Sequence, residues 1–157
     1  MKRLLLLAIL GGCGTDTVNA QGNYTVALTN EDNGCNFMGY TVGAQSTGVA
    51  VAITQQGTNA SADVMGGGGL ILDAVLGGHV FTGSVSGDAL DLKLQGTHAN
   101  TTGNCTYTYN GEIKATLMTD TLTGRISYTA ATNGNSDCAS IQGCVTFQNF
   151  NGTRPPP

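Results

Sequence analysis

Cysteines are the residues of this chain with the widest choice of chemistry, because a thiol can form a disulfide, bind a metal or accept a lipid. The sequence has five cysteines, and four of them follow an apolar leader that predicts export. An even number in an exported chain predicts two disulfides, and Cys35, Cys105, Cys138 and Cys144 allow three pairings. Spacing favours Cys138–Cys144 with Cys35–Cys105, and it is too loose for a metal site.

The fifth cysteine, Cys13, ends the leader. Two basic residues, Lys2 and Arg3, precede an apolar run over residues 4–10 that is too short to span a bilayer. The run ends in Leu10-Gly11-Gly12-Cys13, which resembles the bacterial lipobox. That resemblance implies that Cys13 is acylated through its thiol and becomes the first residue of the mature chain.

This interpretation divides the start of the chain into a signal peptide (1–12) and a lipidated tether (13–21). The membrane is then a partner through the lipid, and two or three acyl chains suffice for stable anchoring. Gly14 stands where aspartate would favour the inner membrane, which implies the outer membrane or the cell surface. An ordinary secretory signal cut after Ala20 is the alternative.

Patterns typical of catalysis are absent from the sequence. It contains no G-x-S-x-G, H-E-x-x-H or G-x-x-x-x-G-K motif. Two histidines, His79 and His98, have no clustered further ligand. Asn133, Asn135 and Asp137 alternate as calcium ligands can, but without the glycine and glutamate of an EF-hand. We therefore expect no enzyme activity, no cofactor and no metal.

The charge balance excludes two classes of partner. The formal net charge is −4, and two of the six basic residues, Lys2 and Arg3, belong to the leader. No basic stripe remains that could follow a phosphate backbone, so nucleic-acid binding is not expected. The same acidity argues against electrostatic docking on anionic lipid, so membrane attachment has to be covalent.

Alternation of apolar and polar residues runs through the rest of the chain and predicts nine antiparallel strands with one apolar face. The apolar members of these runs are Tyr24, Val26 and Leu28; Val49, Val51 and Ile53; Ala60, Ala62 and Val64; Phe81 and Val85; Leu90, Leu92 and Leu94; Cys105, Tyr107 and Tyr109; Ile113, Ala115 and Leu117; Leu122, Ile126 and Tyr128; Val145 and Phe147.

Turn residues separate these runs. Asn110-Gly111 predicts a type I′ hairpin between two of them, because that turn needs positive φ at both positions. Further short turns are expected at Gln56-Gly57, Gly87-Asp88 and Thr119-Asp120. The last three recur at spacings of 31 and 32 residues, as in a meander of repeated hairpins.

One segment departs from the β pattern. Four glycines (66–69) lead into an apolar run in which Ile71, Leu72, Val75 and Leu76 share one helical face, and Gly77 is a natural stop. We expect one short helix that plugs an open end of the β-structure. A lid hinged on the glycines is the less favoured alternative.

Strands joined in sequence by short turns pack best as a closed barrel, which removes sheet edges. The sequence therefore predicts an all-β fold, an antiparallel up-and-down β-barrel of eight or nine strands with one short helix. A two-sheet β-sandwich is the alternative. The barrel domain is expected over residues 22–152, followed by a C-terminal tail (153–157).

The β-meander also resembles that of uncharacterised small bacterial secreted and lipid-anchored proteins with a lipocalin-like (calycin-type) fold. Three segments carry the resemblance: Gly-Asn-Cys-Thr-Tyr-Thr-Tyr at 103–109, Leu-Thr-Gly-Arg-Ile-Ser-Tyr-Thr at 122–129, and Phe-Asn-Gly-Thr-Arg at 150–154. It implies the fold and supplies no set of binding residues.

Two functions fit these observations. A lipid-anchored envelope protein of structural or interaction type, with a filled barrel, is slightly favoured because filled interiors are the commoner outcome. The alternative is a lipocalin-like binder of a small hydrophobic ligand, with Phe81, Tyr107 and Tyr128 on the apolar face as pocket residues. An internal cavity would distinguish the two.

Overall fold

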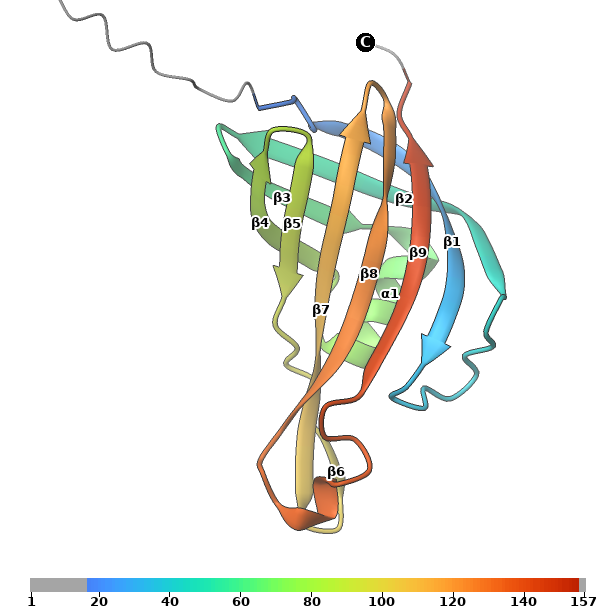
Figure 1. The fold of residues 1–157 in the computed structure, drawn as a ribbon, viewed down its shortest axis with the longest axis vertical. Coiled ribbons are helices and arrows are strands. Elements are labelled where there is room, and N and C mark those ends of the chain that lie inside the picture. Colours follow the sequence, from blue (N-terminus) through green and yellow to red (C-terminus); the bar gives the residue numbers. More distant parts are fainter. Residues whose placement is uncertain (1–16, 156–157) are drawn as a thin grey trace, which may run out of the picture.

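Eight antiparallel strands close into a barrel in the computed structural model, which describes residues 17–155 (Figure 1). The strands follow one another around the barrel in chain order, and the last pairs with the first. They are β1 (Gly22–Asn33), β2 (Gln45–Gln56), β3 (Asn59–Val64), β4 (Val80–Ser86), β5 (Ala89–Leu94), β7 (Cys105–Met118), β8 (Thr121–Thr132) and β9 (Val145–Thr153). The predicted barrel is confirmed, and the sandwich alternative is excluded.

The remaining elements are a helix, α1 (Gly66–Leu76), a short 3₁₀ turn, η1 (Ser136–Cys138), and β6 (Asn100–Thr102). β6 pairs only with β7. Together with η1 it lies on an extension formed where β7 and β8 run on past the barrel (Figure 1). The ninth strand of the sheet is therefore outside the barrel.

Pairing between β5 and β7 closes the barrel. It runs from Ala89 opposite Thr116 to Leu94 opposite Gly111, without a bulge. Leu90, Leu92 and Leu94 are buried while their neighbours along β5 are exposed, as the alternation predicts.

Asn110-Gly111 does not form the predicted hairpin turn. Both residues lie inside β7, so the two expected strands are one strand of 14 residues. The glycine serves close packing instead, because a Cβ at position 111 would lie 2.7 Å from Cε1 of Phe81. The Asn110 side chain accepts a hydrogen bond from the backbone N–H of Gly96 at 2.9 Å, which fixes the chain that leaves β5.

The three other predicted turns are confirmed, and they lie at the end of the barrel where the described chain begins. Val18 donates its N–H to the carbonyl of Gly87 at 2.9 Å, and Ala20 is fully buried. The described part of the expected tether is thus built into the barrel end. Cys13 and the expected signal peptide lie outside the described residues.

Arg154 stabilises the same end of the barrel. Its guanidinium donates to the carbonyl oxygens of Asn19 and Gln21 and, at 2.9 Å, to Oδ1 of Asp120. It also lies over the ring of Tyr24, with 5.6 Å between Cζ and the ring centre. The expected C-terminal tail therefore begins later than predicted, because Thr153 still belongs to β9 and Arg154 is held in place.

All four cysteines after the leader form disulfides, but the favoured pairing is wrong. Cys35 is bonded to Cys144, and Cys105 to Cys138. The first bridge follows from the pairing of β1 with β9, which also aligns the N–H of Gly34 with the carbonyl of Val145 at 3.1 Å. The second joins the start of β7 to η1 and so closes the extension. Each bridge restricts the unfolded chain and contributes about 3 to 5 kcal/mol in the loop-entropy view.

Helix α1 is confirmed, and it ends at Gly77 in the left-handed conformation (φ 82°) that favours glycine. Leu72 and Leu76 are buried as predicted. Ile71 was expected on the same buried face, yet 65 % of it is exposed. The helix approaches β3 so closely at Gly69 that a Cβ there would collide with the Val64 carbonyl, and this seating leaves Ile71 at the rim of the barrel.

Gly111→Ala should destabilise the protein by about 1 to 3 kcal/mol, because the new methyl group overpacks the contact with Phe81. Gly67→Ala is the matched control, since a Cβ at position 67 meets nothing within 4 Å and alanine favours a helix. Its effect should be neutral or stabilising by up to about 1 kcal/mol. Denaturant unfolding of both variants measures the difference, and equal effects would contradict this account of Gly111.

Candidate ligand cavity

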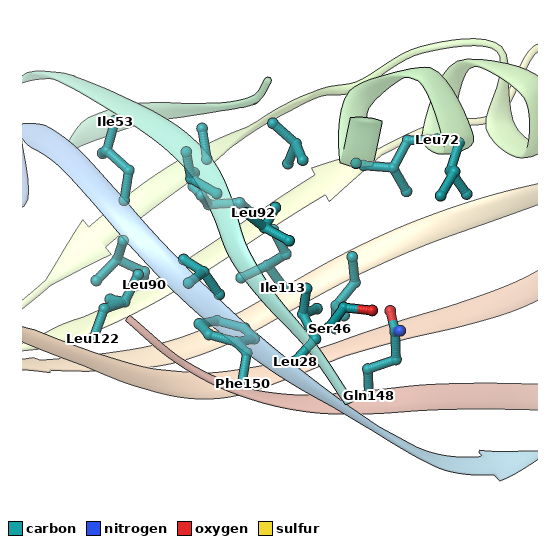
Figure 2. Close-up of a pocket in the computed structure, with 18 of the residues that line it drawn as sticks. Leu28, Ser46, Ile53, Leu72, Leu90, Leu92, Ile113, Leu122, Gln148 and Phe150 are labelled. Carbon is teal, nitrogen blue, oxygen red and sulfur yellow. The ribbon is translucent and has the colours of Figure 1, made fainter. Parts of the chain in front are cut away.

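The barrel encloses an apolar cavity of about 250 Å³. Seven of the eight barrel strands and α1 contribute to its wall, and none of the lining side chains is charged. Its lining residues are Val26, Leu28, Ser46, Val49, Val51, Ile53, Ala62, Val64, Gly68, Ile71, Leu72, Leu90, Leu92, Ile113, Leu122, Ile126, Tyr128, Gln148 and Phe150. Figure 2 draws most of them and labels ten.

Two small residues on the wall, Ala62 and Gly68, leave room for the cavity. Eight-stranded barrels lie at the size where side chains either fill the interior or leave room for one ligand. Ala62 of β3 is buried on the cavity wall, and Gly68 of α1 has no side chain to project into it. A Cβ at position 68 would crowd Val49 and Val64, so glycine here lets the helix come close to the wall without filling the interior.

The mouth of the cavity lies between β2 and α1. Pairing of β2 with β3 begins only at Val51 opposite Val64, so residues 45–50 of β2 run beyond the end of β3. The N–H of Met65 donates to the carbonyl of Ala50 at 2.8 Å, and α1 then follows along this gap. Ser46 and Ile71 are both exposed and both line the cavity, which places the opening to solvent beside them.

Polar groups gather at one part of the wall. The hydroxyl of Tyr128 donates to Oε1 of Gln148 at 2.9 Å, and Nε2 of Gln148 donates to Oδ1 of Asn30 at 2.6 Å. Burial raises the pKa of the Tyr128 hydroxyl well above its ordinary value, so it stays protonated and keeps its role as donor. Ser46 and Gln148 turn their polar ends toward the same space (Figure 2).

Of the three predicted pocket residues, only Tyr128 lines the cavity. Phe81 is fully buried against Gly111 and does not line the cavity. Tyr107 is half-buried at the start of the extension, and its ring packs edge-on against Tyr109 with 5.4 Å between centres. The aromatic character that singled them out serves packing at these two positions.

The sequence patterns missed the polar wall residues and Phe150. In β9 the alternation predicts Val145 and Phe147 on the apolar, inward face. However, Val145 is exposed, and the Phe147 ring lies under the Arg125 guanidinium, with 4.0 Å between Cζ and the ring centre. The alternate residues of β9 face inward instead. Thr146 is fully buried, and Gln148 and Phe150 line the cavity. The signal that identifies them is the register with β1, in which Gln148 lies opposite Asn30.

His79 lies beside α1, at the end of the barrel where the helix packs. Its Nδ1 is 2.7 Å from Oδ1 of Asp73 in α1, and its Nε2 is 3.5 Å from Oδ1 of Asp63 in β3. The hydrogen bond with Asp73 raises the pKa of His79 above its ordinary value. Across residues 17–155, no three His, Cys, Asp or Glu side chains converge as metal ligands. Asp137, which alternates with Asn133 and Asn135 in the sequence, accepts the N–H of Asn104 at 2.9 Å.

Comparisons with known proteins identify no family for this chain. No family model matches the chain, and no curated protein matches it. Among solved structures, the one described as EF1p2_mFAP2b bound to DFHBI is 12 % identical, with 86 % of this chain and 93 % of that chain covered and a TM-score of 0.45. In the described range, no helix has the length and apolar character needed to cross a membrane.

Asp73→Asn should lower the pKa of His79 toward its ordinary value, because it removes the charged acceptor at 2.7 Å. Since the folded-state pKa is raised, protonated His79 stabilises the fold below its unfolded pKa, and this contribution disappears as pH rises through the folded pKa. NMR titration of the ring measures the shift. Asp91→Asn, on the exposed face of β5, is the control and should leave the His79 pKa unchanged.

Proposed function

We propose that this chain is a binding protein that holds a small apolar ligand inside its barrel. The observation that carries the proposal is the cavity of about 250 Å³, with its uncharged wall and its opening beside α1. An apolar cavity of about 150 Å³ is already enough to bind benzene in another protein. A filled barrel acting through its surface, which the sequence patterns slightly favoured, has less support than this alternative.

The size of the cavity limits the ligand. Scaling from benzene in about 150 Å³ gives room for about ten non-hydrogen atoms. Drug-sized ligands occupy pockets of roughly 300 to 1,000 Å³, so the ligand is smaller than these or extends into the mouth. The wall offers no nucleophile paired with a general base, because Ser46 and Tyr128 are its only hydroxyl groups and neither contacts a histidine or carboxylate. We therefore propose binding without catalysis.

Naphthalene, with ten carbon atoms, is a suitable probe. We expect it to bind the purified protein and to raise its melting temperature, because a ligand that binds only the folded state stabilises it. Ala62→Phe adds to the cavity wall a benzene ring, a group for which a cavity of about 150 Å³ has room, and should weaken binding at least about tenfold. Calorimetry and fluorescence of the probe measure the affinity.

The matched control is Ala52→Phe. Ala52 belongs to the neighbouring strand β2, between the inward residues Val51 and Ile53, and does not line the cavity. This variant should bind naphthalene as the unmodified protein does. Equal loss in both variants, or no binding by the unmodified protein, would refute the proposed function.

We further propose that the protein is exported and anchored by lipid at Cys13, on the outer membrane or cell surface. Two disulfides support an oxidising compartment. The contacts of residues 18–20 at the barrel end favour cleavage before Cys13 over cleavage after Ala20, because the later cut would remove residues that the fold uses. Ala20 is fully buried, and its carbonyl accepts the Tyr24 hydroxyl at 2.9 Å.

Mass spectrometry of the N-terminus tests the anchor. The chain expressed in a bacterium that processes lipoproteins should begin at an acylated Cys13 and fractionate with membranes. Cys13→Ser should abolish both acylation and membrane association while leaving the four disulfide cysteines oxidised. An unmodified chain that begins at Gln21 would contradict the lipoprotein proposal.

A further inference from the structure

We infer that the ligand is an uncharged molecule with an apolar body and one hydrogen-bonding group, and that this group lies beside Ser46 and Gln148. The inference rests on the proposed binding function and adds the chemical class and the orientation of the ligand. Three properties of the wall carry it: the absence of charge, the free hydrogen-bonding capacity, and the position of the polar residues.

The wall excludes ions. No lysine, arginine, histidine, aspartate or glutamate lines the cavity. A charged group moved from water into such a space loses its hydration and gains no ion pair, which is among the most costly forms of burial. A carboxylate or an ammonium group is therefore disfavoured inside, however apolar the rest of the molecule.

The polar residues of the cavity wall retain hydrogen-bonding groups that the protein does not use. The Gln148 amide nitrogen carries two hydrogens and donates one to Asn30, which leaves one for another acceptor. The amide is held in place because its oxygen already accepts from Tyr128. Within residues 17–155, no group hydrogen-bonds the Ser46 hydroxyl, which can donate or accept. A ligand hydroxyl or carbonyl would match both groups.

Orientation follows from where these residues lie. Ser46 is exposed at the mouth, whereas Ile53, Leu90 and Leu122 line the far part of the cavity (Figure 2). Ile53 lies opposite Gly22, at the barrel end that residues 18–20 and Arg154 close. An apolar body fills the closed end, and the polar group lies beside Ser46 and Gln148.

Three matched probes test the inference: naphthalene, 2-naphthol and 2-naphthoate, all measured at pH 7 by calorimetry. The unmodified protein should bind naphthalene and 2-naphthol, and it should bind 2-naphthoate at least about tenfold more weakly than 2-naphthol. Gln148→Leu and Ser46→Ala should each weaken 2-naphthol about two- to tenfold, the range of one neutral hydrogen bond, and leave naphthalene unchanged.

The variants separate the possible failures. Gln95→Leu makes the same substitution as Gln148→Leu at an exposed site outside the cavity and should change neither affinity. Ser46→Ala keeps the test valid if loss of Gln148 disturbs folding through Tyr128. Failure of naphthalene to bind the unmodified protein would overturn the proposed function itself. Binding of naphthalene together with equally tight 2-naphthoate, or with unchanged 2-naphthol affinity in both variants, would overturn only this inference.

Discussion

Hydrogen bonding between β5 and β7 is the constraint on which the rest of the structure depends. Seven of the eight pairings within the barrel join barrel strands that follow one another directly in the sequence or are the first and last strands. The β5–β7 pairing is the exception, because β6 lies between these two strands in the sequence. Without it the sheet would have two open edges and no interior. Gly111 stands at the end of this pairing, where the absence of a side chain lets Phe81 and Leu76 close the space between sheet and helix.

The barrel was predictable because its alternation is a local property. The alternation of apolar and polar residues within one strand is enough to show which face is inward. Leu90, Leu92 and Leu94 of β5 are an example. Asn110-Gly111 was misinterpreted because the same dipeptide suits two purposes. Its left-handed tendency favours a turn, but the glycine at 111 is required by a side chain 30 residues away, and packing prevails over local preference. The disulfide pairing was equally out of reach, since it follows from which strands lie side by side.

The candidate site was less predictable than the fold. Tyr128 could be identified because it is both aromatic and in step with Leu122 and Ile126. Gln148 could not, because a polar residue in a strand is ordinarily assigned to the outer face, and only the pairing with β1 turns it inward. The cavity itself has no sequence signature. It results from the sum of inward side chains across seven strands and a helix, where one alanine or glycine decides whether opposite walls meet.

Residues 45–50 of β2 pair with β1 but not with β3, and this gap beside α1 has a consequence for rates. A molecule that passes between residues 45–50 and the helix breaks none of the inter-strand hydrogen bonds that close the barrel. Exchange of the ligand therefore does not require unfolding, and the two processes have separate barriers. The residence time depends on the contacts of the helix and the ligand, whereas the lifetime of the folded chain depends on the closed sheet and its two disulfides. Under the proposed binding function, release of the ligand can therefore be fast while the folded barrel persists.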